Sequence, residues 1–397
     1  MKKFISLFLT NLILLSFCVT GFAKEYSLKF SSDDFRILVL SDTQDDQYPS
    51  ADMLNAVELA VKESQPDLIV FTGDFVEDGK IGLFGDKEPF REGVVVKSKG
   101  EKLHDKTLAN IRKTAGDVLS IFEKYGVPFA IVQGNNDYKC GITNSEWLEI
   151  YSAYPHSLAH DMSDDANDRI DYNLIIGDES GKPVFNLWLM DSGKGGTNED
   201  QLQWLKERNE AIKRENSGKS VPSILFQHIN PPDVGNLFEK CSISDDGARS
   251  TGFMEFYRLN RSIAYGVDTI AYKPCEASAE FRAWKECGNI LGAYFGHQHV
   301  DGFCGTVDGI ELGFNLGLEM EKLGPYGYRL ITLHKSDAEN YGNDLYLYKG
   351  SVKTGNAHYE KYTETGYKEY TSVFEKALNT VKNIFVILDC LIREAIA

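Results

Sequence analysis

Short apolar runs recur along the chain, and each of them ends in a polar turn. They cover residues 35–40, 68–72, 129–132, 185–190, 223–226 and 291–295. Runs of this length, rich in branched and aromatic residues, are typical of strands that are buried on both faces. After Ser50, apolar residues recur at helical spacing from residue 53 to residue 61, and Pro66 ends this helix. The pattern predicts an α/β fold whose first two strands are parallel neighbours.

Two longer helices and several alternating segments complete the predicted elements. The helices cover residues 107–125 and 199–213. Residues 78–106 are rich in Gly and Lys without clear periodicity, which predicts an irregular excursion over the surface. Apolar and polar residues alternate in three shorter segments, and we expect these to form a second, partly antiparallel sheet. These segments are residues 309–315, 328–334 and 344–348.

The last part of the chain has a different pattern. Between residues 372 and 397, apolar residues form one wide stripe of a helix. Such a stripe either packs onto the rest of the protein or contacts a second copy or a membrane surface. It carries no residues typical of catalysis.

Composition and charge narrow the range of functions. The chain has 397 residues, of which 42% are hydrophobic and 25% charged, as in a globular protein with a large core. Its formal net charge is −17. This acidic balance disfavours nucleic-acid binding, an exported nuclease included, because a nucleic-acid site needs a basic footprint. Some of the carboxylates are instead candidates to hold cations.

The N-terminus resembles an export signal. Lys2 and Lys3 precede an apolar stretch at residues 4–19, and small residues lead to Ala23 before the charged Lys24. These are the n-region, h-region and cleavage site of a signal peptide at residues 1–23. We therefore expect a secreted, periplasmic or cell-surface protein. An uncleaved membrane anchor is the alternative, because the stretch is nearly long enough to span a bilayer.

The cysteines permit disulfides in such a compartment. Seven are present, and six remain if Cys18 leaves with the signal peptide. An even number is compatible with a disulfide framework, but the spacing does not define its connectivity. Cys275 and Cys287 flank one short segment and are the first pair to test. Free thiols are the alternative.

Polar residues with metal-binding side chains follow the predicted strands. Because the carboxyl ends of strands in an α/β sheet meet at one edge, we expect these side chains to converge. They offer carboxylate, amide and imidazole donors without thiolates, a mixture that suits zinc, manganese or iron. The candidate ligands are Asp42, Gln44, Asp74, Asn135, His228, His297 and His299.

The order of these motifs resembles that of the calcineurin-like metallophosphoesterases. Its elements are Asp42-Thr43-Gln44, Gly73-Asp74, Gly134-Asn135-Asn136-Asp137, His228 and Gly296-His297-Gln298-His299. The resemblance covers residues 35–334. Residues 186–193, Trp204, residues 226–228 and residues 296–304 are similar to the secreted, purple-acid-phosphatase-like subgroup. The resemblance implies a four-layer α/β/β/α sandwich of two mixed β-sheets flanked by helices.

The resemblance also implies a dinuclear metal centre that hydrolyses phosphate esters. Asp42, Gln44 and His299 would hold one ion, and Asn135, His228 and His297 would hold the other. Asp74 would bridge them and keep the pair together against their mutual repulsion. Two adjacent cations lower the pKa of a shared water, and the resulting hydroxide attacks phosphorus.

This sequence departs from the family pattern at three positions. Gln44 replaces a His in the first motif and offers a weaker ligand. Asn136 replaces the His that stabilises the transition state, and an amide cannot act as a general acid. We therefore expect either leaving groups that need little protonation or a substitute acid from elsewhere in the chain. Glu77 replaces the tyrosinate ligand of the purple enzymes, so a purple ferric site is not expected.

These observations predict a phosphatase or phosphodiesterase with Asp74 and Asn136 at its catalytic centre. The chain would consist of a signal peptide at residues 1–23, a metallophosphoesterase domain at 30–350 and a C-terminal extension with an amphipathic helix at 351–397. The sequence does not distinguish monoester from diester substrates. The alternative interpretation is a related protein that binds metal or a phosphorylated ligand without efficient turnover, because of Gln44 and Asn136.

Overall fold

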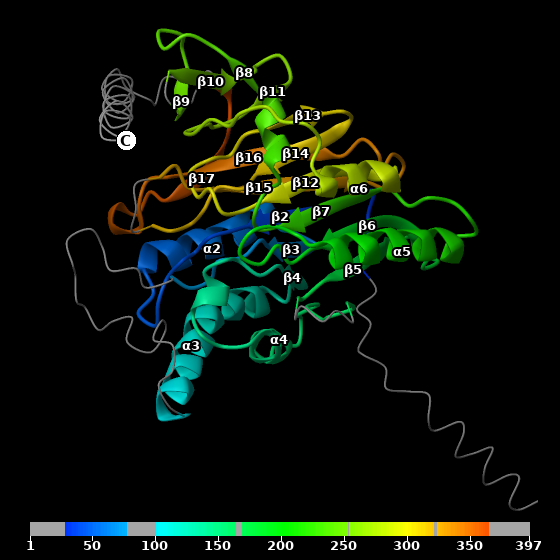
Figure 1. Ribbon diagram of the computed structural model, residues 1–397. Coiled ribbons are helices and arrows are strands. Elements are labelled where there is room, and N and C mark those ends of the chain that lie inside the picture. The colour runs from blue at the N-terminus through cyan, green and yellow to red at the C-terminus, as the bar shows by residue number, and fades with distance from the viewer. Residues whose placement is uncertain (1–27, 78–100, 164–168, 253, 321–323, 365–397) are drawn as a thin grey trace, which may run out of the picture.

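Two large mixed β-sheets form the centre of the protein, and helices cover their outer faces (Figure 1). The computed structural model describes residues 28–77, 101–163, 169–252, 254–320 and 324–364. Helices α2 and α3 lie beside the six-stranded sheet, and α5 and α6 lie beside the eight-stranded sheet. This arrangement confirms the predicted α/β/β/α sandwich.

The six-stranded sheet carries the first two strands of the predicted βαβ unit. Its strand order is β17-β16-β15-β2-β3-β4. Strands β2 and β3 are parallel neighbours, as predicted, and β4 is parallel to them, whereas β15, β16 and β17 pair antiparallel. The strands are β2 Asp34–Leu40, β3 Leu68–Phe71, β4 Phe129–Ile131, β15 Gly327–His334, β16 Gly342–Lys349 and β17 His358–Lys361. The sheet therefore continues past residue 350.

The eight-stranded sheet has four parallel strands at its centre, and the next strand on each side pairs with them antiparallel. Its order is β1-β5-β6-β7-β12-β14-β13-β11, in which β6, β7, β12 and β14 are parallel. The strands are β1 Leu28–Lys29, β5 Tyr172–Gly177, β6 Pro183–Leu189, β7 Ser223–Gln227, β11 Ala264–Tyr265, β12 Ile290–Phe295, β13 Cys304–Val307 and β14 Ile310–Phe314. A small antiparallel sheet, β8-β10-β9, lies beside it. Its strands are β8 Phe238–Lys240, β10 Glu255–Leu259 and β9 Arg249–Gly252.

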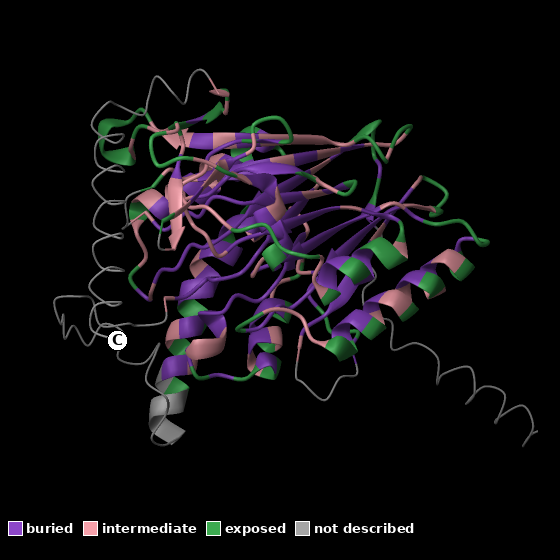
Figure 2. Ribbon diagram, turned by 45° about the horizontal axis from the view of Figure 1, so that its top comes forward, coloured by how far each residue is buried: buried purple, intermediate pink, exposed green. Residues whose placement is uncertain are grey.

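The alternation of side chains along each central strand builds two separate layers of core. In β7, Ile224 and Phe226 pack into the layer shared with the six-stranded sheet. Leu225 points to the opposite face, where it joins the cluster that includes Leu205 of α5 and Trp284 of α6. Figure 2 shows that the central strands are largely buried, whereas the helices have buried and exposed sides. The unbroken apolar runs of the sequence are thus strands that are covered on both faces.

The helices begin where the sequence supplies capping residues. The Ser50 hydroxyl accepts a hydrogen bond from Met53 N at the start of α2. Asn198 and Gln201 form a capping box at the start of α5. The helices are α2 Ala51–Ser64, α3 Glu101–Tyr125, α4 Asn144–Ser152, α5 Glu199–Glu215 and α6 Ala279–Cys287. Short 3₁₀ turns are η2 Asp137–Lys139, η3 Pro232–Leu237 and η4 Val352–Thr354.

One prediction about the sheets is wrong. The segments at residues 309–315, 328–334 and 344–348 do not form a second sheet together. Strand β14 pairs in parallel with β12, whereas β15 and β16 extend the first sheet from β2. Alternation reports which face of a strand is buried and does not identify its neighbour. Strands β5 and β13 and helices α4 and α6 were not predicted from the sequence.

Several predictions concern residues outside the described ranges. The signal peptide, the C-terminal helix and Cys390 lie there, as do residues 78–100 of the predicted excursion. Helix α3 starts at Glu101, six residues before the predicted start. The described cysteines are free, so Cys275 and Cys287 do not form a disulfide in this structure. Among the described helices, none combines the length and hydropathy needed to cross a membrane.

A buried carboxyl group in α6 makes a pH dependence of stability testable. Glu280 is 8% exposed. Burial raises the pKa of Glu280 to about 7, although Thr197 and Gln227 lower it. Between the unfolded and folded pKa values the native state binds the extra proton, so the free energy of unfolding falls as pH rises from about 4.5 to about 7.

Glu280→Gln should remove this dependence, because the amide does not titrate. The stability of the variant relative to the wild type should rise by about 2–3 kcal/mol between pH 4.5 and pH 8, measured by denaturant unfolding. Glu286→Gln is the matched control, because that side chain is 60% exposed on the same helix. If the free energy of unfolding changed with pH in the same way for wild type and Glu280→Gln, the raised pKa of Glu280 would be wrong.

Candidate metal centre

The loops after β2, β3, β7 and β12 meet where the two sheets face each other. Backbone hydrogen bonds continue past the strand ends, from Asp42 N to Gly73 O and from Gln44 N to Asp74 O, both 3.0 Å. Two contacts then join the sheets. His228 Nδ1 lies 2.8 Å from Thr72 O, and the backbone N–H of His297 donates to Asp42 Oδ2 at 3.0 Å. The predicted side chains are therefore brought together by the fold.

The carboxylate of Asp74 occupies the centre of this cluster and is fully buried. Its Oδ2 atom lies 3.2 Å from His228 Nε2 and accepts hydrogen bonds from Gln44 Nε2 at 2.7 Å and Asn136 Nδ2 at 2.9 Å. Its Oδ1 atom accepts from Asn136 N at 2.8 Å. Asp74 thus contacts residues of the first, third and fourth motifs, as expected of a shared group.

One group of donors lies on the side of His228. One end of the Asn135 amide is 3.1 Å from His228 Nε2 and 2.7 Å from His297 Nδ1. Because His228 Nδ1 faces the carbonyl of Thr72, a proton on Nδ1 leaves the Nε2 lone pair directed at Asn135 and Asp74. When His228 carries its only proton on Nδ1, as a metal ligand would, three lone pairs converge here, those of one amide oxygen and two imidazoles.

A second group lies on the side of Asp42. His299 Nε2 is 3.4 Å from Asp42 Oδ1, and donor atoms of Asp42, Asp74 and His299 lie within 4.8 Å of one another. His299 Nδ1 faces Glu319 Oε2 at 2.7 Å. A carboxylate on the second nitrogen fixes the ring and its tautomer, as is usual for histidines that bind metal.

Gln44 and Asn136 both direct their amide nitrogens at the shared carboxylate. Each donates to Oδ2 of Asp74, at 2.7 Å and 2.9 Å respectively. The structure therefore brings Gln44 to the predicted site, but with its nitrogen rather than its oxygen toward Asp74. To act as a ligand, this amide has to turn and release the carboxylate.

The carboxyl group of Asp137 holds two loops of the cluster together. Its carboxylate accepts hydrogen bonds from Asp74 N at 2.9 Å, Phe75 N at 3.0 Å and Gly134 N at 2.9 Å. Burial and the neighbouring charge of Asp74 raise the pKa of Asp137 to about 7. Asp137 thus orients the two loops that carry Asp74 and Asn135, which agrees with its position in the third motif.

The backbone of the cluster is unusual. Left-handed conformations, which are uncommon for residues other than Gly, occur at most of the predicted ligands. These are Asp42, Gln44, Asp74, His297 and His299, with φ between 37° and 72°. A side chain at Gly134 would collide with the Asp74 carboxylate, so this position requires Gly. Such strain is typical of functional sites, where the surrounding structure maintains it.

The pKa values of the buried titratable groups are shifted by desolvation and by their mutual interactions. Burial raises the pKa of Asp42, against the lowering effect of His299. Burial also acts on Asp74 and His228, but their mutual attraction outweighs it, so the pKa of Asp74 is lowered and that of His228 is raised to about 10. Burial and the charge of His228 lower the pKa of His297 to about 4.

The donor set fits metal ions. Oδ1 of Asp42 is buried without a hydrogen-bond partner, which is costly for a carboxylate oxygen unless a cation compensates it. One end of the Asn135 amide faces two imidazole nitrogens, and a cation between them would stabilise its oxygen in this position. Oxygen and nitrogen donors without thiolates suit zinc, manganese or iron.

Comparison with known families agrees with this geometry. The family model of the calcineurin-like phosphoesterases matches residues 35–301, about two thirds of the chain. The chain belongs to this family. The match begins at β2 and ends just beyond the Gly296–His299 motif, so it covers the phosphoesterase strands that carry the cluster.

Named relatives of this chain include plant proteins. The chain is 24% identical over 318 residues to "Probable inactive purple acid phosphatase 14" of Arabidopsis thaliana, covering 72% of this chain and 68% of the relative. It is 22% identical over 315 residues to "Probable inactive purple acid phosphatase 29", covering 71% and 68%. A solved dimetal phosphatase from Danio rerio aligns with a TM-score of 0.45 and 12% identity, covering 83% of this chain and 98% of that one.

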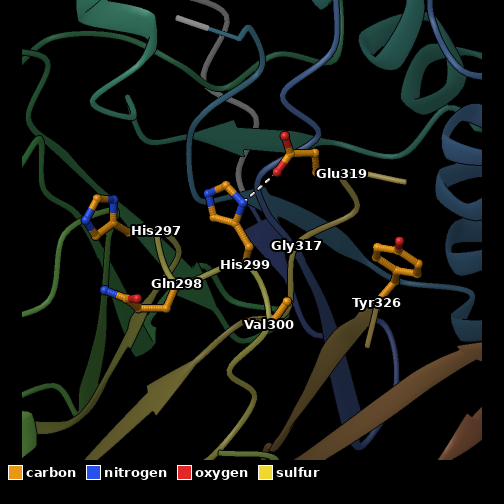
Figure 3. Close-up of a pocket in the computed structure, with 7 residues that line it drawn as sticks. All are labelled: His297, Gln298, His299, Val300, Gly317, Glu319 and Tyr326. Atoms are coloured by element: carbon orange, nitrogen blue, oxygen red, sulfur yellow. Dashed lines mark hydrogen bonds and ion pairs between the residues drawn. The ribbon is translucent and has the colours of Figure 1, made fainter. Parts of the chain in front are cut away.

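A cavity of about 310 Å³ opens beside the phosphoesterase cluster (Figure 3). His297 and His299 form one wall, and Tyr326 lies on the other side of His299 from His297. The remaining lining residues are Gln298, Val300, Gly317 and Glu319. Because two predicted ligands line it, a molecule bound in this cavity contacts the cluster directly.

Some residues of the phosphoesterase site were not predicted. Ser41 donates a hydrogen bond to Asp42 Oδ2, and Glu319 orients His299. Glu319 lies five residues after β14, so the rule that polar residues follow buried strands could have identified it. Lys139 lies two residues after the third motif, and its Nζ donates to Asn136 Oδ1 at 2.8 Å. A basic residue beside a motif has no sequence signal that separates it from surface lysines.

Loss of the Glu319 carboxylate should weaken metal binding at the cluster. Glu319→Ala removes the acceptor that orients His299, and loss of a group that orients a metal ligand typically reduces metal affinity about 10–100-fold. Glu319→Gln keeps an acceptor and should retain most of the affinity. The measurement is competition with a chelating dye. Glu339→Ala, at an exposed position, is the control, and equal affinities in the two Ala variants would contradict the assigned role.

Proposed function

We propose that the protein is a phosphoester hydrolase that works with two metal ions at this cluster. One ion would be held by Asp42, His299 and, after rotation of its amide, Gln44. The other would be held by the donors Asn135, His228 and His297. Asp74 would be shared between the two ions.

The observation that carries the proposal is the position of Asp74 between two donor groups. His228 Nε2 lies 3.2 Å from Oδ2 of Asp74, and Asp42 and His299 have donor atoms within 4.8 Å of it. Both groups are composed of atoms that bind cations, and the buried Oδ1 of Asp42 accepts no hydrogen bond. A structural ion pair would explain one of these groups but not both.

When bound, two such ions polarise the phosphoryl oxygens and lower the pKa of a water molecule. The chain itself contributes fixed geometry. Asp137 holds the loops of Asp74 and Asn135 together, and Glu319 fixes the ring of His299. The cavity beside His297 and His299 receives the ester. Preorganisation of this kind reduces the reorganisation required in the transition state.

Asn136 indicates which esters react best. Its side chain donates to Asp74, and an amide has no proton to transfer to a leaving oxygen. Esters with good leaving groups, such as aryl phosphates, should therefore react faster than alkyl phosphates. Monoesters and diesters are equally compatible with the cluster.

A second candidate function is metal and phosphate binding without efficient turnover. Gln44 directs its nitrogen at Asp74, which weakens the first metal position until the amide turns. The named relatives are also described as probably inactive phosphatases. The two candidates differ in turnover and not in fold.

We also propose that the protein is exported. The basic, apolar and small-residue regions at residues 1–23 support this proposal. Sequencing the N-terminus of the protein from its native host tests it. A mature chain that begins at Lys24 supports cleavage, whereas an intact Met1 in the membrane fraction supports the anchor.

Asp74→Asn should abolish both metal retention and hydrolysis. The amide removes the negative charge that holds two cations together. The expected result is fewer than one metal ion per chain by elemental analysis and no hydrolysis of aryl phosphate monoesters or diesters. Asp33→Asn, at an exposed position, is the control. A wild type with two ions per chain but no turnover on either ester would support the binding protein instead.

Gln44→His should strengthen the weaker metal position. The imidazole replaces an amide whose nitrogen now faces Asp74 at 2.7 Å. We expect the wild type to bind one ion tightly and a second at least about 10-fold more weakly, and the variant to bring the two affinities closer. Calorimetric titration with Zn²⁺ or Mn²⁺ measures both steps. Two equal affinities in the wild type would contradict this asymmetry.

A further inference from the structure

We propose that Lys139 and Asn136 form a binding site for a phosphoryl oxygen of the substrate beside the metal centre. This inference rests on the proposed function and names the residues that take the place of the absent family histidine. In this site, the Lys139 ammonium binds the anionic oxygen, and Asn136 holds the ammonium in position.

Asn136 connects Lys139 to the shared carboxylate. The Nζ atom of Lys139 donates to Asn136 Oδ1 at 2.8 Å, and Asn136 Nδ2 donates to Asp74 Oδ2 at 2.9 Å. Asn135 Nδ2 also donates to Asn136 Oδ1, at 3.0 Å. These contacts fix the orientation of the Asn136 amide. The ammonium is therefore held one amide away from the carboxylate that both metal ions would share.

The turn that carries Lys139 is anchored from several directions. Lys139 N donates to Asn136 O at 2.8 Å, which closes the 3₁₀ turn η2. Between these residues, Asp137 accepts backbone hydrogen bonds from the loops of the cluster. The hydroxyl of Tyr138 donates to Asp191 Oδ2 at 2.5 Å and accepts from Asn144 Nδ2 at 2.9 Å. Lys139 thus extends from a rigid base, which lowers the entropic cost of binding an anion.

The Lys139 ammonium adds positive charge on the side of Asn136, beside the charge that the two metal ions of the proposed function would bring. Asp42, Asp74 and Asp137 lie buried in one cluster. A phosphate ester brings further negative charge to the same place. Lys139 is half-buried, so its ammonium is less screened than on an open surface. Its compact charge is suited to phosphate oxygens, and charge-assisted hydrogen bonds are about twice as strong as neutral ones.

Asn136 alone cannot bind a phosphoryl oxygen. Its Nδ2 donates to Asp74, and its Oδ1 is an acceptor that repels a phosphoryl oxygen. Because an ammonium has three donors, Lys139 can contact Asn136 and a second neighbour and still direct the third hydrogen bond at the ester. The Lys139–Asn136 pair thereby supplies the positive charge that a single histidine would supply, but no acid for the leaving group.

The test is the affinity of inorganic phosphate for the full chain loaded with Zn²⁺ or Mn²⁺, measured by calorimetry. Lys139→Met should weaken phosphate binding at least about 10-fold, with the metal content unchanged. Lys139→Arg should retain part of the affinity. Lys113→Met is the matched control, because Lys113 is 53% exposed on α3 and pairs with Asp117. If Lys139→Met fails to fold, Lys139→Gln, which keeps a polar side chain, replaces it.

Three outcomes overturn the inference. Equal phosphate affinity in the wild type and Lys139→Met would show that Lys139 does not bind the anion. Loss of metal from the Lys139 variants would make Lys139 a structural support for the metal centre. Absence of phosphate binding by the metal-loaded wild type would remove the site itself.

The outcomes also separate this inference from the proposed function. If the wild type hydrolyses aryl phosphates but phosphate binding is independent of Lys139, the proposed hydrolase function is supported and the anion site at Lys139 is wrong. If phosphate binding depends on Lys139 but neither aryl monoesters nor diesters are hydrolysed, the anion site at Lys139 is supported and the proposed hydrolase function is wrong. In an active enzyme, Lys139→Met should raise KM for aryl phosphates as well as lower kcat.

Discussion

The structure depends on the burial of negative charge between two sheets. Asp42, Asp74 and Asp137 are all fully buried, although a carboxylate loses a large hydration energy when it leaves water. Asp137 is compensated by backbone N–H groups and Asp74 by His228 and two amides. Asp42 keeps one oxygen without a hydrogen bond. The cluster is thus only partly compensated by the chain, and a cation is the natural partner for the remainder.

The two-sheet architecture is what makes this burial attainable. Parallel strands direct their carboxyl ends to one edge, and stacking a second sheet on the first brings two such edges together. Thr72 on the six-stranded sheet meets His228 on the eight-stranded sheet, and Asp42 meets the backbone of His297. The apolar layer between the sheets, which includes Ile69, Phe226 and Tyr294, fixes their separation. Core packing and site geometry are therefore set by the same side chains.

Much of this organisation could be predicted from local sequence patterns. The apolar runs of β2, β3, β7 and β12 and the polar residues that follow them predicted the strands and the candidate ligands. Features that depend on a distant neighbour could not be predicted. The alternation in β14, β15 and β16 does not specify a pairing partner, and those strands joined different sheets. Glu319 and Lys139 acquire their roles through contacts with His299 and Asn136, which only the fold defines.

Two of the three departures from the family pattern, Gln44 and Asn136, converge on a single atom. Gln44 and Asn136 both donate to Oδ2 of Asp74, the oxygen that also lies 3.2 Å from His228 Nε2. A carboxylate oxygen accepts about two hydrogen bonds through its lone pairs, so three donors crowd it, and a cation that approaches Asp74 has to displace one of them. A neutral amide is displaced at lower cost than a charged imidazolium. Gln44 is the donor that can turn away, because Asn136 is held at both ends by Asp74 and Lys139. The two substitutions therefore put an amide where the family pattern has an imidazole, and a cation at the Asp42 side would have to displace the Gln44 hydrogen bond first.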